Sequence, residues 1–210
     1  MVRIKICGIT NLTDAQLAAE LGAHALGFIF YPKSPRSIAP EAVREIIRQL
    51  PPFVATVGVF VDENAPRVRE IASLAGLDWV QLHGQETPDY CRSLGHRVIK
   101  GFRIKGPESL AQLTDYREAA QALLLDTYKP GTPGGTGETF DWDLARQAKK
   151  YGAIILAGGL TPANVAQAIR VAQPMAVDVA SGVEAAPGKK DPEKLRAFFE
   201  AINKSPLPPL

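Results

Sequence analysis

Short apolar segments recur along this chain with amphipathic segments between them, and this alternation strongly limits the folds it can adopt. The apolar segments are rich in aliphatic and β-branched residues, which is typical of buried strands. Eight segments are predicted as strands, at 3–7, 25–30, 54–60, 79–82, 98–102, 122–125, 154–157 and 176–179. An unbroken strand–helix rhythm predicts βα units around a parallel sheet.

The intervening segments have the apolar spacing of helices. Helices are predicted at 13–21, 40–50, 64–75, 143–151, 162–171 and 192–203, with a less regular helical pattern at 107–120. Asp141 is expected to begin the helix at 143–151. Thr161 and Pro162 are expected to supply the cap and first-turn proline of the helix that follows.

Eight strands with crossovers in 210 residues fit a single-domain (β/α)₈ TIM barrel of the α/β class better than an open doubly wound sheet. The barrel is expected to span residues 1–205, and residues 206–210 to form a frayed tail. In such barrels the chemistry lies on the loops that follow the strands. Here glycines and uncommon polar residues gather in those loops.

Composition excludes several function classes. A net charge of +2 without long single-sign runs predicts neither nucleic-acid nor membrane-surface binding. The two cysteines, Cys7 and Cys91, provide neither a disulfide framework nor a zinc ligand set. The chain starts on a strand with no apolar leader and has no run that could span a bilayer, so we expect a cytoplasmic protein. A homodimer is compatible with the sequence.

Cys7 stands at the end of the first predicted strand, just before Gly8 and on the same face as Lys5. A thiol in that place can act as a base. A nearby ammonium is expected to lower the thiol pKa. The alternative is that Cys7 is a small buried hydrophobe, and this segment alone supports the two interpretations about equally.

The ends of strands six to eight carry further candidates. Asp126 precedes the glycine-rich run 131–137, which suits an acid–base group beneath a lid, although an aspartate there can also simply cap a turn. Glycine-containing loops at strands seven and eight commonly bind phosphate, and ordinary tight turns are the alternative. The candidate phosphate-binding residues are Gly158, Gly159, Ser181 and Gly182.

Three more side chains are candidates for substrate binding. Arg36 lies in a stiff cationic loop and could hold a carboxylate through two hydrogen bonds, or could simply be solvated. His83 ends strand four on the face opposite Leu82, so it points into the site or is a hydrogen-bonded structural histidine. Asp178 could hold a sugar hydroxyl or orient a loop.

Taken together, these motifs resemble the phosphoribosylanthranilate isomerase family of tryptophan biosynthesis over nearly the whole chain. The resemblance rests on the segments 5–10, 35–36, 81–84, 125–126, 134–137, 140–142, 156–160 and 178–184. It implies an Amadori rearrangement of N-(5′-phosphoribosyl)anthranilate, with Cys7 as general base and Asp126 as general acid. It further implies that Arg36 meets the anthranilate carboxylate, that His83 and Asp178 lie near the substrate, and that the glycine loops hold its phosphate.

The implied chemistry needs no metal and no organic cofactor, because the sugar iminium formed from the substrate is its own electron sink. Asp126 must start protonated and Cys7 must act as thiolate. Other function classes fit these residues less well. A related isomerase of the histidine pathway has an aspartate where Cys7 stands, and Lys100 is poorly placed for Schiff-base aldolase chemistry. A barrel that binds a phosphorylated ligand without converting it is the non-enzymatic alternative.

Overall fold

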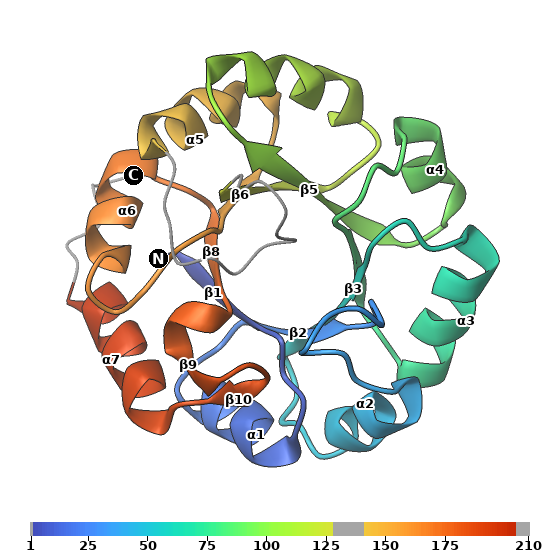
Figure 1. Ribbon diagram of the computed structural model, residues 1–210, viewed down its shortest axis with the longest axis vertical. Helices are drawn as coiled ribbons and strands as arrows, with labels where there is room; N and C mark the ends of the chain where they lie inside the picture. The colour runs from blue at the N-terminus through green and yellow to red at the C-terminus, as the bar shows by residue number, and fades with distance from the viewer. Residues whose placement is uncertain (1, 128–140, 205–210) are drawn as a thin grey trace.

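Eight strands form a closed parallel barrel, and helices surround it (Figure 1). The computed structural model describes residues 2–127 and 141–204. Each strand pairs with the next along the chain, and β8 closes the ring by pairing with β1. The barrel strands are β1 Arg3–Cys7, β2 Ala25–Ile29, β3 Ala55–Phe60, β4 Trp79–Leu82, β5 Arg97–Ile104, β6 Ala122–Thr127, β7 Ile154–Leu156 and β8 Ala176–Val179. The predicted TIM barrel is confirmed.

The helices form an outer ring around these strands. They are α1 Leu12–Glu20, α2 Pro40–Ile47, α3 Ala65–Ala75, α4 Pro88–Ser93, α5 Trp142–Ala148, α6 Val165–Ala172 and α7 Pro192–Asn203. The 3₁₀ segments are η1 Pro107–Tyr116, η2 Lys149–Tyr151 and η3 Ser181–Val183, and a separate antiparallel hairpin comprises β9 Glu184–Ala186 and β10 Lys189–Lys190. Within the described ranges, every helix is too short or too polar to cross a bilayer.

Alternating strand residues face the barrel interior and the helical layer. In β6, Leu123 and Leu125 pack in the outer core, whereas Leu124 belongs to the smaller core inside the barrel. By the same alternation Asp126 faces inward at the carboxyl end of its strand. The interior core contains Val57, Ile99, Ala122, Leu124, Ile155, Ala157 and Ala176. Polar inward-facing residues beyond this core are therefore available for a site at the carboxyl ends.

Side-chain caps set the helix boundaries. Asn64 begins α3, with its Oδ1 accepting a hydrogen bond from the Arg67 backbone N–H at 3.0 Å, and Gly76 ends it in the left-handed region at φ 77°. Asp141 begins α5 as predicted, because its side chain accepts from the Asp143 backbone N–H at 3.0 Å. Because capping residues can be recognised in a sequence, they helped to predict the corresponding helices.

The predicted start of the sixth helix at Thr161 and Pro162 is wrong, since α6 begins at Val165. The Asn164 Oδ1 accepts from the Thr161 backbone N–H at 2.8 Å, and its amide nitrogen donates to the Gly159 carbonyl at 2.9 Å. Both bonds close a turn before the helix. A local side chain has thus taken backbone groups that an earlier helical turn would have used.

Other differences concern short elements. Helix α4 was not among the predicted helices, because its six residues are too few for a helical apolar period. The segment predicted as a less regular helix at 107–120 is a 3₁₀ helix, η1. The glycine-rich run 131–137, Phe140 and the expected tail at 206–210 lie outside the described residues.

A buried ion pair fixes the loop that follows β4. The Lys100 ammonium lies 3.1 Å from the Glu86 carboxylate, with both side chains almost fully buried. Lys100 also donates to the carbonyl oxygens of Gly84 and Gly101 at 2.8 and 3.0 Å. Because the loop begins at His83, this pair holds a candidate site residue against β5.

Replacing Lys100 with methionine should destabilise the protein by about 3–5 kcal/mol, because it leaves the Glu86 carboxylate buried without its partner. Urea unfolding followed by circular dichroism measures the change. The matched control is Lys204→Met, whose partner Glu200 and own side chain are 64% and 77% exposed, so its unfolding curve should overlay the wild type. Equal effects of the two substitutions would contradict the assigned role of burial.

Candidate active site

A cavity of about 340 Å³ opens at the carboxyl ends of the barrel strands. Its lining includes all five side chains proposed from the sequence for proton transfer and substrate binding, namely Cys7, Arg36, His83, Asp126 and Asp178. They come from β1, the loop after β2, the end of β4, β6 and β8. The fold therefore collects these residues from widely separated parts of the chain into one place.

A smaller hollow of about 50 Å³ shares Asp126 and Asp178 with the main cavity. Its lining includes the four candidate phosphate-binding residues Gly158, Gly159, Ser181 and Gly182. A Cβ on Gly182 would overlap the Leu160 carbonyl oxygen, so the loops after β7 and β8 meet at van der Waals contact. Backbone amides that are not covered by side chains suit a small anion such as phosphate.

Cys7 is buried on the inner face of β1, with 6% of its surface exposed. Burial raises the pKa of the Cys7 thiol, and the neighbouring Lys5 ammonium opposes this shift without overcoming it. The expectation that Lys5 gives a lowered thiol pKa is therefore wrong in its net direction. Desolvation inside the barrel is the larger effect. A thiolate formed here is a strong base that is scarce at neutral pH.

Lys5 and Asp178 form a buried ion pair at the same side of the cavity. The Lys5 ammonium lies 2.9 Å from the Asp178 Oδ1. Burial alone lowers the pKa of Lys5, but the Asp178 carboxylate and Cys7 together outweigh burial, and the net shift is upward. Lys5 therefore stays charged beside the thiol.

Both carboxylate oxygens of Asp126 have close polar neighbours. Its Oδ1 accepts from the Thr127 backbone N–H at 2.8 Å, and its Oδ2 lies 3.3 Å from the His83 Nε2. The alternative role of Asp126 as a turn cap therefore holds for Oδ1 only, which accepts from the backbone. The other oxygen faces His83, whose ring points into the cavity as the strand alternation predicted.

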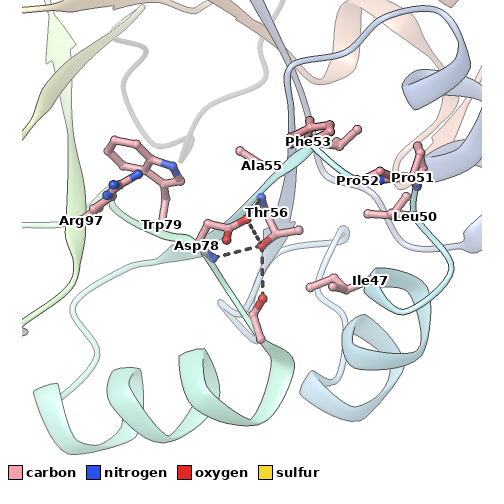
Figure 2. A pocket seen from close by; sticks show the side chains of 12 residues that line it. Ile47, Leu50, Pro51, Pro52, Phe53, Ala55, Thr56, Asp78, Trp79 and Arg97 are labelled. Atoms are coloured by element: carbon pink, nitrogen blue, oxygen red, sulfur yellow. Dashed lines mark hydrogen bonds between the residues drawn. The ribbon is translucent and has the colours of Figure 1, made fainter.

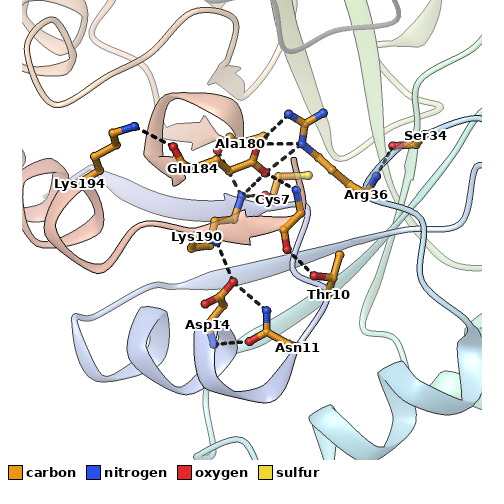
Figure 3. A network of polar contacts seen from close by, with 11 residues as sticks. Cys7, Thr10, Asn11, Asp14, Ser34, Arg36, Ala180, Glu184, Lys190 and Lys194 are labelled. Carbon is orange, nitrogen blue, oxygen red and sulfur yellow. Dashed lines mark hydrogen bonds and ion pairs between the residues drawn. The ribbon is translucent and has the colours of Figure 1, made fainter. Parts of the chain in front are cut away.

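Arg36 is not free in this structure but is held by Glu184, as Figure 3 shows. The Arg36 Nε donates to the Glu184 Oε1 at 2.9 Å, and its Nη2 donates to the Oε2 at 2.7 Å. The solvated alternative for Arg36 is therefore wrong. A bidentate pair of this kind fixes the plane of the guanidinium and leaves Nη1 for another acceptor.

Lys190 ties this pair to the catalytic candidate on β1 (Figure 3). Its fully buried ammonium lies 3.0 Å from the Glu184 Oε1 and donates to the Cys7 carbonyl oxygen at 2.6 Å. Burial disfavours the Glu184 carboxylate, but its bonds to Arg36 and Lys190 outweigh burial and lower its pKa. The hairpin β9–β10 is thereby anchored to the end of β1.

Glu184 and Lys190 were not among the site residues proposed from the sequence. The signal for their hairpin was the Pro187–Gly188 dipeptide, which favours a turn between two short extended segments. In the sequence, Lys189 and Lys190 look like two neighbouring lysines on the surface. The complete burial of Lys190 follows from a contact with β1 that no local pattern encodes.

The fold and this site define a (β/α)₈-barrel enzyme with its chemistry at the carboxyl ends of the strands. Among the described residues, no group of three or more His, Cys, Asp or Glu side chains is arranged to hold a metal ion. The organic groups of the site are a thiol, carboxylates, an imidazole and cations, which are acid–base and anion-binding groups.

Comparison with known proteins identifies the family. The model of the N-(5′-phosphoribosyl)anthranilate (PRA) isomerase family matches residues 4–201. The N-(5′-phosphoribosyl)anthranilate isomerase of Geobacter sp. (strain M21) is 57% identical over 204 residues, which are 97% of this chain and 99% of the relative. The chain therefore belongs to the phosphoribosylanthranilate isomerase family, whose members are isomerases of tryptophan biosynthesis.

Solved structures agree with this assignment. Monomers generated from the dimeric phosphoribosylanthranilate isomerase of Thermotoga maritima are 43% identical, with a TM-score of 0.87 and coverage of 97% of this chain and 99% of that chain. A phosphoribosylanthranilate isomerase in complex with reduced 1-(o-carboxyphenylamino)-1-deoxyribulose 5-phosphate is 45% identical, with a TM-score of 0.88 and the same coverage.

Alkylation of Cys7 by iodoacetamide in the ligand-free protein should accelerate with pH, with a midpoint above the value of about 8.5 for a free cysteine. The reason is that burial favours the neutral thiol, so the reactive thiolate appears at higher pH. Peptide mass mapping separates this reaction from that of Cys91, whose pKa burial raises to about 11. A Cys7 midpoint below that of free cysteine would contradict the assigned dominance of desolvation.

Proposed function

We propose that this isomerase converts N-(5′-phosphoribosyl)anthranilate to 1-(2-carboxyphenylamino)-1-deoxyribulose 5-phosphate, with Cys7 as general base and Asp126 as general acid. The observation that carries the proposal is the single cavity lined by both residues, which adjoins the hollow formed by the loops after β7 and β8. The complex of a relative with a reduced form of this product supports the choice of substrate.

The reaction proceeds by two proton transfers on one sugar. Protonated Asp126 gives its proton to the ribose ring oxygen, the bond from that oxygen to the anomeric carbon breaks, and the anilino nitrogen becomes an iminium. The Cys7 thiolate then takes the proton from the adjacent sugar carbon, which the iminium has acidified. The enolamine that results tautomerises to the ketose. A thiolate with a raised pKa is a strong base for this carbon acid.

The two anionic ends of the substrate have separate receptors in this proposal. The phosphate lies against the backbone of Gly158, Gly159, Ser181 and Gly182, and the anthranilate carboxylate meets Arg36. Because Glu184 already occupies the Nε edge of Arg36, the substrate carboxylate approaches the Nη1 side. Asp178 supports the site through Lys5, to which it is paired.

Cys7→Ala and Asp126→Asn should each lower kcat by roughly 10²–10⁴-fold, the range that a positioned acid or base contributes. The fluorescence of the anthranilate group follows substrate consumption directly. The circular dichroism of both variants should match the wild type, because neither substitution changes the volume of the core greatly. The matched control is Cys91→Ala, which removes the other thiol from the helical layer and should leave kcat unchanged.

Near-normal turnover in either catalytic variant would remove that residue from the mechanism. If the wild-type protein binds the fluorescent substrate without any change over time, the chain is a binding module and not a catalyst.

A cytoplasmic location is part of the proposal. It is supported by two cysteines that are both unpaired, as is usual in reducing compartments.

We further propose that the protein forms a homodimer through the amino-terminal end of its barrel. Phe53 is completely exposed there and has a positive φ of 73°, which is uncommon for an aromatic residue. A hollow of about 460 Å³ lies beside it, lined by residues that include Ile47, Trp79 and Arg97 (Figure 2). The dimeric relative from Thermotoga maritima supports the formation of a homodimer. In the arrangement we propose, each Phe53 enters the hollow of the other copy.

Phe53→Asp should convert the dimer to a monomer, because it removes the aromatic ring that fills the hollow and replaces it with a charged group that loses its hydration there. Sedimentation velocity at micromolar concentration measures the state. The control Gln167→Asp places the same charge on the exposed face of α6 and should remain dimeric. A monomeric wild-type protein, or a dimeric Phe53→Asp variant, would disprove this interface.

A further inference from the structure

Gln81 is a buried polar residue of β4 to which neither the sequence nor the proposed mechanism gives a role. Its side chain lines the main cavity, and 2% of its surface is exposed. The amide nitrogen lies 3.1 Å from the Nδ1 of His83. The amide oxygen has no hydrogen-bond partner among the described residues. A buried amide with one unmet oxygen is costly, so its single contact needs an explanation.

With its amide nitrogen toward the ring, Gln81 favours one tautomer of His83. An amide nitrogen donates hydrogen bonds and does not accept them, so the Nδ1 that faces it must be the unprotonated nitrogen. A neutral imidazole then carries its hydrogen on Nε2. That nitrogen lies 3.3 Å from the Oδ2 of Asp126. The hydrogen of the neutral ring therefore sits on the nitrogen nearest the candidate acid.

We propose that Gln81 is a positioning residue, which fixes His83 in the Nε2–H tautomer so that the imidazole donates to Asp126. The inference rests on the proposed role of Asp126 as the general acid. The imidazole hydrogen bond stabilises the carboxylate that remains after Asp126 has given its proton to the ribose ring oxygen. The Thr127 backbone N–H does the same at the Oδ1 of Asp126, at 2.8 Å.

A glycine in the neighbouring strand makes room for the His83 ring. A Cβ on Gly101 of β5 would lie 2.6 Å from the Nδ1, so the glycine is what allows the ring to stand beside Gln81. The His83 backbone N–H donates to the Phe60 carbonyl oxygen at 2.9 Å, and this bond fixes the start of the loop. The ring is thus positioned by the strand ends and its tautomer by one amide.

Nitrogen-15 NMR of the histidine rings in the ligand-free wild-type protein tests the tautomer without any reference to activity. The chain has three histidines, and His83→Asn assigns the signal of His83 by its disappearance. His24 is an internal reference, because its Nδ1 accepts the Ile4 backbone N–H at 3.2 Å and should also be unprotonated. The expected result is an His83 spectrum with hydrogen on Nε2 alone.

Two substitutions at Gln81 then separate a tautomer effect from loss of packing. Gln81→Met keeps the shape and removes the donor, so the two neutral tautomers of His83 should become mixed. Gln81→Glu replaces the donor with an acceptor, so Nδ1 should become protonated. Both should lower kcat about tenfold or more, a part of the roughly 10²–10⁴-fold contributed by an aligned acid, with KM less affected. Gln167→Met, on the exposed face of α6, should change neither the spectrum nor kcat.

A wild-type spectrum with hydrogen on Nδ1, or on both nitrogens, would overturn the proposal whatever the kinetics show. An unchanged His83 spectrum in Gln81→Met and Gln81→Glu would do the same. If the spectra behave as expected while Asp126→Asn retains full activity, the tautomer assignment stands and the proposed role of Asp126 fails. The two failures are therefore distinguishable.

Discussion

The ion pair between Lys5 and Asp178 lies where the first and last strands of the barrel meet, and the site depends on it. Lys5 and Asp178 are direct register partners across the β1–β8 seam, with their charged atoms 2.9 Å apart. Closing the ring brings both charges into a space from which water is largely excluded, where each needs the other. Cys7 is two residues beyond Lys5 on the same inward face. The ion pair that forms when the barrel closes therefore also sets the electrostatic environment of the thiol.

A second charged cluster extends this arrangement outward from the barrel. Glu184 holds Arg36 through two hydrogen bonds and pairs with Lys190, whose ammonium also bonds to the Cys7 carbonyl. Each cation therefore has a defined partner before any ligand arrives. Preorganised groups of this kind lose little freedom when a substrate binds, so more of the binding energy remains for the reaction.

Local patterns were enough to predict the barrel and to place Asp126 and His83 at the carboxyl ends of its strands. Asp126 and His83 could be placed because strand alternation assigns a face to each residue, and because parallel strands end at one side of the barrel. The Glu184 contacts could not be predicted. Arg36 lies 148 residues away along the chain, and their meeting requires the closed ring.

The predicted direction of the Cys7 pKa shift was wrong for a related reason. The sequence shows the charge of Lys5 two positions away, but it does not show how deeply the thiol is buried, and burial is the larger influence. The predicted start of α6 was wrong because the Asn164 side chain accepts a hydrogen bond from the backbone N–H of Thr161. Capping preferences do not distinguish this local hydrogen-bond pattern from an earlier helix start. The contacts of Gln81 likewise depend on the space left by a glycine in the neighbouring strand.

The anchoring of Cys7 by Lys190 has a consequence for how the protein is made. The ribosome releases β1 first, but the ammonium that bonds the Cys7 carbonyl belongs to residue 190 of 210. Asp178, the partner of Lys5, is also translated late. Until Asp178 and Lys190 have been translated, the nascent chain consequently carries its thiol without the shelter that the closed barrel provides. A nascent chain that stalls before the β9–β10 hairpin lacks Glu184 and Lys190, so it cannot complete the surroundings of Cys7.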